Sequence, residues 1–138
     1  MSEQQRQWVI DLPWDAPPIK PNGGYANRYA HAAKVRSVRQ TAGLLARHAG
    51  IPRGLTRIRV QLVWYVGDRR RRDTDNLWML LKSVCDAMTP AGRQGQPTDW
   101  PVVEDDTPEF MEKPEPQIVY RKGQRKRLVV FVERLDMQ

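Results

Sequence analysis

The stretch from residue 57 to residue 66 alternates between apolar and polar side chains, and no other feature constrains the fold of this chain as strongly. Every second position is apolar, the positions being Ile58, Val60, Leu62, Trp64 and Val66. A period of two indicates a β-strand, because successive side chains of a strand point to opposite faces of the sheet. Val63 and Tyr65 lie between these positions, so we expect one face of the strand to be well buried and the other partly covered.

A helix is predicted after this strand. Residues 67–68 end the strand, and Thr74 or Asp75 offers an N-cap for the helix. We expect the helix to continue to about Met88, since Pro90 cannot extend it. Its apolar positions recur at the spacing of one helical face and are Leu77, Leu80, Leu81, Val84 and Met88.

The N-terminal part of the chain predicts a strand, a loop and another helix. Residues 8–12 have the pattern of a short strand that Pro13 ends. The prolines and glycines of residues 13–27 exclude regular structure and predict a long, exposed loop. A helix is expected over residues 30–48, with Gly43 lowering the helix propensity of its interior.

The C-terminal part completes the expected fold. Residues 89–101 contain glycines and prolines and indicate an irregular, mobile segment. Residues 118–120 and 128–132 flank Gly123 and predict a β-hairpin. The element order is then β-α-β-α-β-β, which predicts one α+β domain over residues 1–138, with a small mixed sheet and two main helices.

The charge of the chain favours a polyanionic partner. Its 138 residues carry a formal net charge of +7, with a pI of about 10.0, and contacts from Lys and Arg to phosphates release counterions. Positive charge is concentrated in the run Arg69–Arg72 and again within residues 121–127. Acidic side chains crowd between these two clusters, a concentration that indicates salt bridges or a metal site; they are Asp99, Glu104, Asp105, Asp106, Glu109, Glu112 and Glu115.

Other signals favour a reducing, cytoplasmic setting. No run of about 18 apolar residues is long enough to span a membrane, and residues 1–7 lack the apolar region of a secretory signal. The single cysteine, Cys85, cannot form an internal disulfide and has no histidines at zinc spacing. We expect Cys85 to be a small core residue, and neither His31 nor His48 has a visible triad partner.

The acidic residues around the second helix indicate phosphodiester hydrolysis. Asp73 and Asp75 follow the arginine run, and residues two apart at the end of an extended segment point to the same side and can share an ion. Asp105 or Asp106 supplies a third carboxylate, which suits the oxygen ligands that Mg²⁺ prefers. A metal ion held in this way activates water and stabilises the extra negative charge on phosphorus.

Lys82 is the positively charged side chain best placed to contact a phosphate of the substrate. At about 100° per residue, Asp75, Lys82 and Asp86 share nearly one helical face. At about 1.5 Å per residue, Lys82 lies roughly 10 Å from Asp75 along the axis and Asp86 lies roughly 16 Å away. We therefore expect Lys82 to reach a phosphate and Asp86, too distant to share the metal, to be structural.

Each of these features also has a purely structural explanation. An Asp-x-Asp pair before a helix is a common capping arrangement, a Glu-Asp-Asp loop is usually solvated, and an arginine run is more often solvated than a binding surface. Tryptophans more often pack in a core than stack on bases; those considered are Trp14, Trp64, Trp78 and Trp100. The order of the features along the chain is what favours a functional site.

In that order, the features resemble the RusA family of Holliday junction resolvases. The matching segments are residues 69–77 (Arg-Arg-Arg-Arg-Asp-Thr-Asp-Asn-Leu), 86–88 (Asp-Ala-Met) and 103–106 (Val-Glu-Asp-Asp). Near the N-terminus the similar segments are Leu12-Pro13-Trp14, Pro17-Pro18 and Asn27-Arg28-Tyr29. The resemblance covers nearly the whole chain, and the Arg-rich Asp-x-Asp-Asn-Leu motif is its most specific part.

The resemblance implies a RusA-like fold and a concrete activity. Members of the family are intracellular, Mg²⁺-dependent endonucleases, often carried by phages or prophages, that act as homodimers and nick four-way DNA junctions symmetrically during recombination and repair. The catalytic carboxylates would be Asp73, Asp75 and Asp106, with Asp105 as a further metal ligand, Mn²⁺ as a substitute ion, and neither an organic cofactor nor a membrane partner. The DNA-binding residues would be Arg69, Arg70, Arg71, Arg72, Asn27 and Arg28.

This chain departs from the family pattern at one position of the helix. The family has a catalytic lysine four residues after the second motif aspartate, where this chain has Met79. The span from Asp75 to Asp86 is also nearly one helical turn longer than in the family. Alignment back from Asp86 makes Lys82 the counterpart of the lysine.

The sequence therefore favours a structure-selective endodeoxyribonuclease that resolves Holliday junctions. A non-catalytic DNA-binding recombination-accessory protein accounts for the basic charge equally well, and Met79 is what a decayed enzyme would carry. A nuclease acting on other branched DNA is a third hypothesis. The three motif aspartates favour an enzyme, because carboxylates without a cation oppose the binding of a phosphate backbone.

Overall fold

The long alternating strand lies inside a five-stranded sheet. The structure, a computed structural model, describes residues 5–19, 28–90, 92 and 95–135. Strand β2 (Ile58–Val66) pairs antiparallel with β5 (Arg127–Arg134), and β5 pairs antiparallel with β1 (Gln7–Asp11). On its other side β2 pairs parallel with two short strands, β3 (Met111–Glu112) and β4 (Gln117–Tyr120). The predicted α+β class with a mixed sheet is confirmed.

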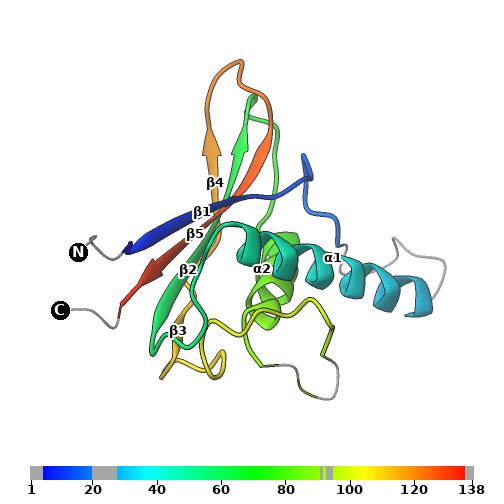
Figure 1. Ribbon diagram of the computed structural model, residues 1–138. Helices are drawn as coiled ribbons and strands as arrows, with labels where there is room; N and C mark the ends of the chain where they lie inside the picture. Colours follow the sequence, from blue (N-terminus) through cyan, green and yellow to red (C-terminus); the bar gives the residue numbers. More distant parts are fainter. Residues whose placement is uncertain (1–4, 20–27, 91, 93–94, 136–138) are drawn as a thin grey trace.

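Helices α1 (Arg28–His48) and α2 (Asp75–Ala87) lie on the same side of the sheet (Figure 1). The side chains of β2 that face them are all buried, and Val63 on the opposite face is only 5% exposed while Tyr65 is half-buried. The strand is therefore covered well on one face and partly on the other, as predicted. Among the described residues, no helix is both long and apolar enough to cross a membrane.

Helix α2 is the more deeply buried of the two helices. Its buried residues include the whole predicted apolar stripe within the helix, and Met88 directly after it is also fully buried. The segment that follows covers the end of the helix, since the backbone N–H groups of Trp100 and Val102 donate to the carbonyl oxygens of Ala87 (2.7 Å) and Met88 (2.8 Å). These bonds satisfy carbonyl groups that a helix end leaves without an intrahelical partner.

The predicted hairpin between residues 118–120 and 128–132 is wrong. Strand β2 lies between β4 and β5 and pairs with both of them. The connection from β4 to β5 passes around the end of β2, where the Arg121 N–H donates to the Val66 carbonyl oxygen at 2.8 Å. Gly123 has a positive φ of 72° and lies in the turn that the sequence predicts. A glycine at a turn does not indicate whether the two flanking strands pair with each other or with a third strand.

The segment at residues 95–101, predicted to be mobile, is fixed against both helices. Arg39 of α1 forms a two-pronged ion pair with Asp99, with distances of 3.0 Å from Nε to Oδ1 and 2.7 Å from Nη2 to Oδ2. The Asp99 side chain is 2% exposed and the Arg39 side chain is 12% exposed. The Trp100 indole N–H donates to the Ile51 carbonyl oxygen at 2.7 Å. Proline and glycine exclude regular structure here, and tertiary contacts supply the order instead.

Candidate nucleic-acid interface and carboxylate site

The two basic clusters of the sequence meet at one end of the sheet. Parallel pairing places the last residue of β4, Tyr120, beside the last residue of β2, Val66. The segment after β2 and the connection after β4 therefore begin side by side, and the Arg69 guanidinium lies 4.5 Å from the centre of the Tyr120 ring. We name as the basic tip the cationic residues gathered there, which are Arg69, Arg70, Arg71, Arg121, Lys122, Arg125 and Lys126.

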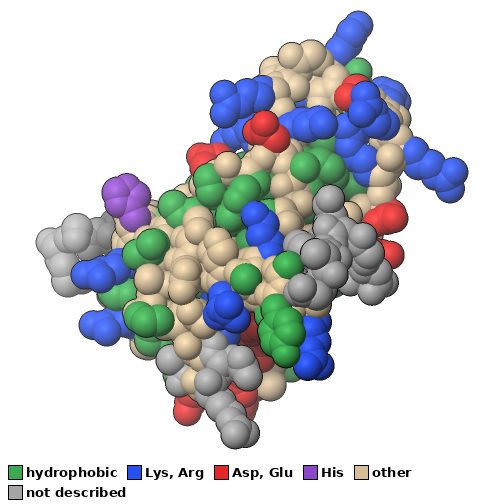
Figure 2. Space-filling view, turned by 90° about the vertical axis from the view of Figure 1, so that its right-hand side faces the viewer, with side chains coloured by type: hydrophobic (Ala, Val, Ile, Leu, Met, Phe, Trp, Pro, Cys, Tyr) green, Lys and Arg blue, Asp and Glu red, His purple; other side chains and the backbone are tan. Residues whose placement is uncertain are grey.

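The basic tip is a cationic surface. Lys126 is half-buried and the other six residues are exposed. Figure 2 shows Lys and Arg side chains concentrated at the upper end of the molecule. Within the part of the chain that the structure describes, none of the seven forms an ion pair with Asp or Glu. Their charge is therefore available to a partner.

Arg72 has a different environment from the rest of its run. Its side chain is only 9% exposed and forms a 2.9 Å ion pair with Asp68, while its guanidinium lies 5.3 Å from the Trp64 ring centre. A hydrogen bond from the Arg70 N–H and one from Arg72 lower the pKa of the Asp68 carboxyl. Arg72 thus holds the loop in shape, and exposed positive charge in the run comes from Arg69, Arg70 and Arg71.

Asp73 and Asp75 lie at the start of α2, directly after the basic tip. Thr74 is the N-cap residue but makes no side-chain capping bond. Instead the Asp73 carboxylate accepts a hydrogen bond from the Asp75 backbone N–H at 3.1 Å. The Asp75 carboxylate makes no hydrogen bond or ion pair with any described residue. Both residues are exposed, and a negative charge here is stabilised by the helix dipole.

Asp106 and Asp86 form a second carboxylate pair near the other end of α2. Asp106 lies 3.6 Å from Lys113 Nζ, and Asp86 lies 3.7 Å from Lys82 Nζ. Partial burial raises the pKa of the Asp86 carboxyl and the nearby Asp106 carboxylate raises it further, while Lys82 and Arg39 oppose the shift. The distance from Asp75 predicts a structural role for Asp86, but no local pattern in the sequence indicates that the loop after α2 brings Asp106 into its vicinity.

The carboxylates predicted to share one ion are thus divided between the two ends of α2. Among the described residues, no three Asp, Glu, His or Cys side chains are grouped closely enough to hold a metal ion. Asp105 is exposed, and one of its oxygens accepts a hydrogen bond from the Asp106 N–H at 2.8 Å. The pair Asp73 and Asp75 nevertheless has the donor chemistry that suits Mg²⁺, which proteins commonly hold through one or two carboxylates together with substrate phosphates and water.

Cys85 and the two N-terminal DNA-binding candidates add little to this site. Cys85 is fully buried, and burial raises the pKa of its thiol to about 12, which is the behaviour of a core residue. Arg28 begins α1, is exposed and stacks on Tyr29 at 5.2 Å from the ring centre. Asn27 lies outside the described residues.

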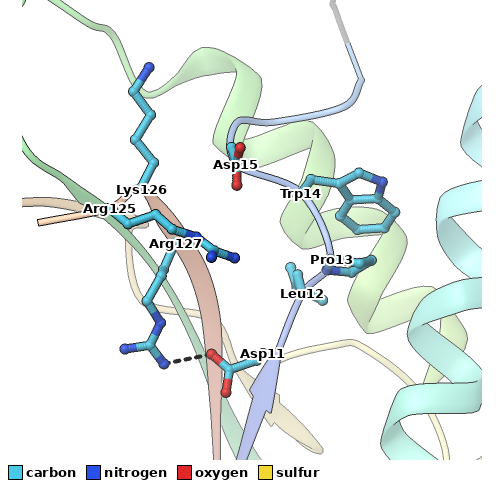
Figure 3. A pocket seen from close by; sticks show the side chains of 8 residues that line it. All are labelled: Asp11, Leu12, Pro13, Trp14, Asp15, Arg125, Lys126 and Arg127. Atoms are coloured by element: carbon cyan, nitrogen blue, oxygen red, sulfur yellow. Dashed lines mark hydrogen bonds and ion pairs between the residues drawn. The ribbon is translucent and has the colours of Figure 1, made fainter.

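A cavity of about 520 Å³ lies between the end of β1 and the start of β5. Figure 3 shows its walls, with Arg125, Lys126 and Arg127 on one side and residues 11–15 on the other. Arg127 donates to the Asp11 carboxylate at 2.6 Å, and the Trp64 indole N–H donates to the Asp15 carbonyl oxygen at 2.9 Å. The first bond joins β5 to the end of β1, and the second attaches the proline-containing segment after β1 to β2.

The comparisons with known proteins show no family for this chain. No protein-family model matches the chain, and a search of curated proteins finds no match.

Proposed function

We propose that this protein is a Mg²⁺-dependent endodeoxyribonuclease that acts on branched DNA in the bacterial cytoplasm and, as a homodimer, resolves Holliday junctions by paired symmetric nicks. The observation that carries the proposal is the succession of exposed arginines and exposed carboxylates in the loop between β2 and α2. Arg69–Arg71 are followed within four residues by Asp73 and Asp75. The order of motifs that resembles the RusA family supports the same activity.

Electrostatics explains why this succession suits a nuclease. Arginines bind the DNA backbone without reading its sequence. Two carboxylates next to that backbone repel it unless a cation lies between them. Residues that attract a phosphate on one side and a divalent cation on the other bring the two together, which is the arrangement that phosphodiester hydrolysis requires.

In the proposed reaction, Asp73 and Asp75 would hold Mg²⁺. The ion would supply Lewis-acid stabilisation of the negative charge on the phosphoryl oxygens and would activate water. Arg69–Arg71 hold the backbone in position. We propose that Asp106, Asp105 and Lys82 also serve the reaction. The motif resemblance supports all three, and Asp106 and Lys82 also share Asp86 as a neighbour.

A non-catalytic DNA-binding protein is the second candidate. It is favoured by Met79 at the position of the family lysine and by the separation of the carboxylates into two pairs. Such a protein would bind branched DNA through the same arginines and leave it intact.

The test compares wild type, Asp75→Asn and Asp106→Asn on a labelled four-way junction, with Mg²⁺, with Mn²⁺ and with EDTA. Binding and strand cleavage are read from the same samples, and Glu115→Gln, an exposed carboxylate away from α2, is the control. We expect symmetric nicking that requires the metal, is unchanged in the control, and falls about 100-fold or more in Asp75→Asn while binding persists. Binding without cleavage by wild type under every condition would support the accessory protein instead.

Loss of cleavage in Asp106→Asn would assign a catalytic part to the second carboxylate pair. Unchanged cleavage in that variant would restrict the site to Asp73 and Asp75. Cleavage of flaps or single strands in preference to the junction would keep the enzyme class and replace the proposed substrate.

A further inference from the structure

A small hollow in the basic tip is lined by three arginines. It has a volume of about 130 Å³, and its walls are Tyr65, Arg121, Gln124, Arg125 and Arg127. Of the described residues that line it, none is Asp or Glu. A concavity of this size bordered by guanidinium groups matches an oxyanion, because guanidinium donors suit the oxygen geometry of phosphate.

Two of the arginines are held in place by the Tyr65 ring. The Arg121 guanidinium lies 5.0 Å from the ring centre and that of Arg127 lies 6.0 Å from it. Stacking on an aromatic face limits the freedom of a long side chain. Positioned donors lose less conformational entropy when they bind an anion than free ones do.

The loop that carries the hollow is itself fixed to the sheet. The Arg121 N–H donates to the Val66 carbonyl oxygen, the Gly123 N–H to that of Gly67 at 3.3 Å, and the Gln124 N–H to that of Arg121 at 3.0 Å. A Cβ added to Gly67 would overlap the Gln124 carbonyl oxygen, so the two segments lie in direct contact. Arg127 is further anchored by its ion pair with Asp11.

We infer that this hollow binds one backbone phosphate of a DNA duplex arm. The inference rests on the proposed function only in taking DNA as the polyanion. The surroundings favour an extended polyanion over a free phosphate, because the other residues of the basic tip, Lys122, Lys126 and Arg69–Arg71, add positive charge outside the hollow. The contact is independent of base sequence, and it extends the DNA-binding surface from the segment after β2 to the connection between β4 and β5.

The test measures binding of a labelled 20-base-pair duplex without divalent ions, so that cleavage does not interfere. The variant is Arg121→Gln with Arg125→Gln. Its matched control is Arg53→Gln with Arg36→Gln, since in each pair one arginine stacks on an aromatic ring and the other makes no such contact. Arg53 precedes β2, at the opposite end of that strand from the tip. Circular dichroism establishes that both variants are folded.

We expect the slope of log Kobs against log salt concentration to become shallower by about 1 in the variant, as for the loss of one phosphate contact, with affinity about tenfold weaker near 0.1 M salt. The control should retain both the slope and the affinity. Equal changes in variant and control, or no change in either, would overturn the inference.

Two further measurements, NMR titration and binding to lipid vesicles, identify the ligand. In NMR spectra of the arginine Nε–H groups, micromolar duplex should shift the signals of Arg121 and Arg125. A response to inorganic phosphate alone, or tighter binding to phosphatidylserine vesicles than to duplex, would overturn the inference. If the protein binds duplex in this way but never cleaves a junction, the inference stands and the proposed function is wrong. If the protein cleaves junctions but the variant binds duplex as tightly as wild type, the proposed function stands and the inference is wrong.

Discussion

At the scale of single residues, identical side chains take different roles according to what surrounds them. Arg70 is exposed while Arg72, two positions later, is 9% exposed and paired with Asp68. Asp75 is exposed at a helix start, whereas Asp86 is partly buried near Asp106. Solvation and neighbouring charge, rather than residue type, therefore divide the charged residues into structural ones and ones available to a partner.

The pH dependence of stability should reveal the environment of Asp86. Burial raises the pKa of this carboxyl in the folded protein above its unfolded value, so the ionised form opposes folding at neutral pH and the opposition fades as pH falls through the folded pKa. Asp86→Asn should therefore raise the Tm at pH 7, and the gain should shrink toward pH 4. Thermal unfolding followed by circular dichroism across this range measures it.

Glu109→Gln, an exposed carboxylate in the neighbouring loop, is the control and should show no such pH-dependent gain. A lower Tm for Asp86→Asn at pH 7, or a gain of equal size at pH 4, would contradict this account of Asp86.

At the scale of elements, helix α1 packs closely against the backbone of residues 98–99, a contact that the sequence of the helix does not indicate. Gly43 lies in the helix interior, where glycine is about 1 kcal/mol less favourable than alanine. A Cβ at this position would overlap the backbone carbonyl oxygen of Thr98. Glycine therefore weakens the isolated helix and permits the packing of residues 98–99 that places Asp99 against Arg39.

Gly43→Ala should accordingly destabilise the protein although it improves helix propensity. The overpacking of a backbone contact costs about 1–3 kcal/mol, which outweighs the propensity gain and leaves a net loss of about 1–2 kcal/mol. Urea unfolding measures the difference. Ser37→Ala, on the exposed side of the same helix, should change the free energy of unfolding by less than about 0.5 kcal/mol; a stabilising Gly43→Ala would refute the close approach.

At the scale of the whole molecule, one core joins all the main elements. The contiguous set of buried side chains includes residues of β1, both helices, β2, β5 and the segment after α2. The first and last strands are neighbours in the sheet (Figure 1). A single core closed by the first and last strands favours cooperative unfolding.

We therefore expect one two-state transition in urea. The tryptophans report from different elements, with Trp8 in β1, Trp64 in β2 and Trp78 in α2. Tryptophan fluorescence and far-ultraviolet circular dichroism should give coincident transitions. Loss of the helical signal at a lower urea concentration than the fluorescence change would show that the helices unfold separately from the sheet.

The sequence by itself determined the periodic elements, because their signals are local. Alternation identified β2, and an apolar stripe identified α2. The pairing of β4 with β2, the meeting of the two basic clusters and the return of Asp106 to Asp86 were decided only in the tertiary structure. Each of these brings together residues tens of positions apart, and such contacts depend on which strand occupies the centre of the sheet, which no local pattern of side chains records.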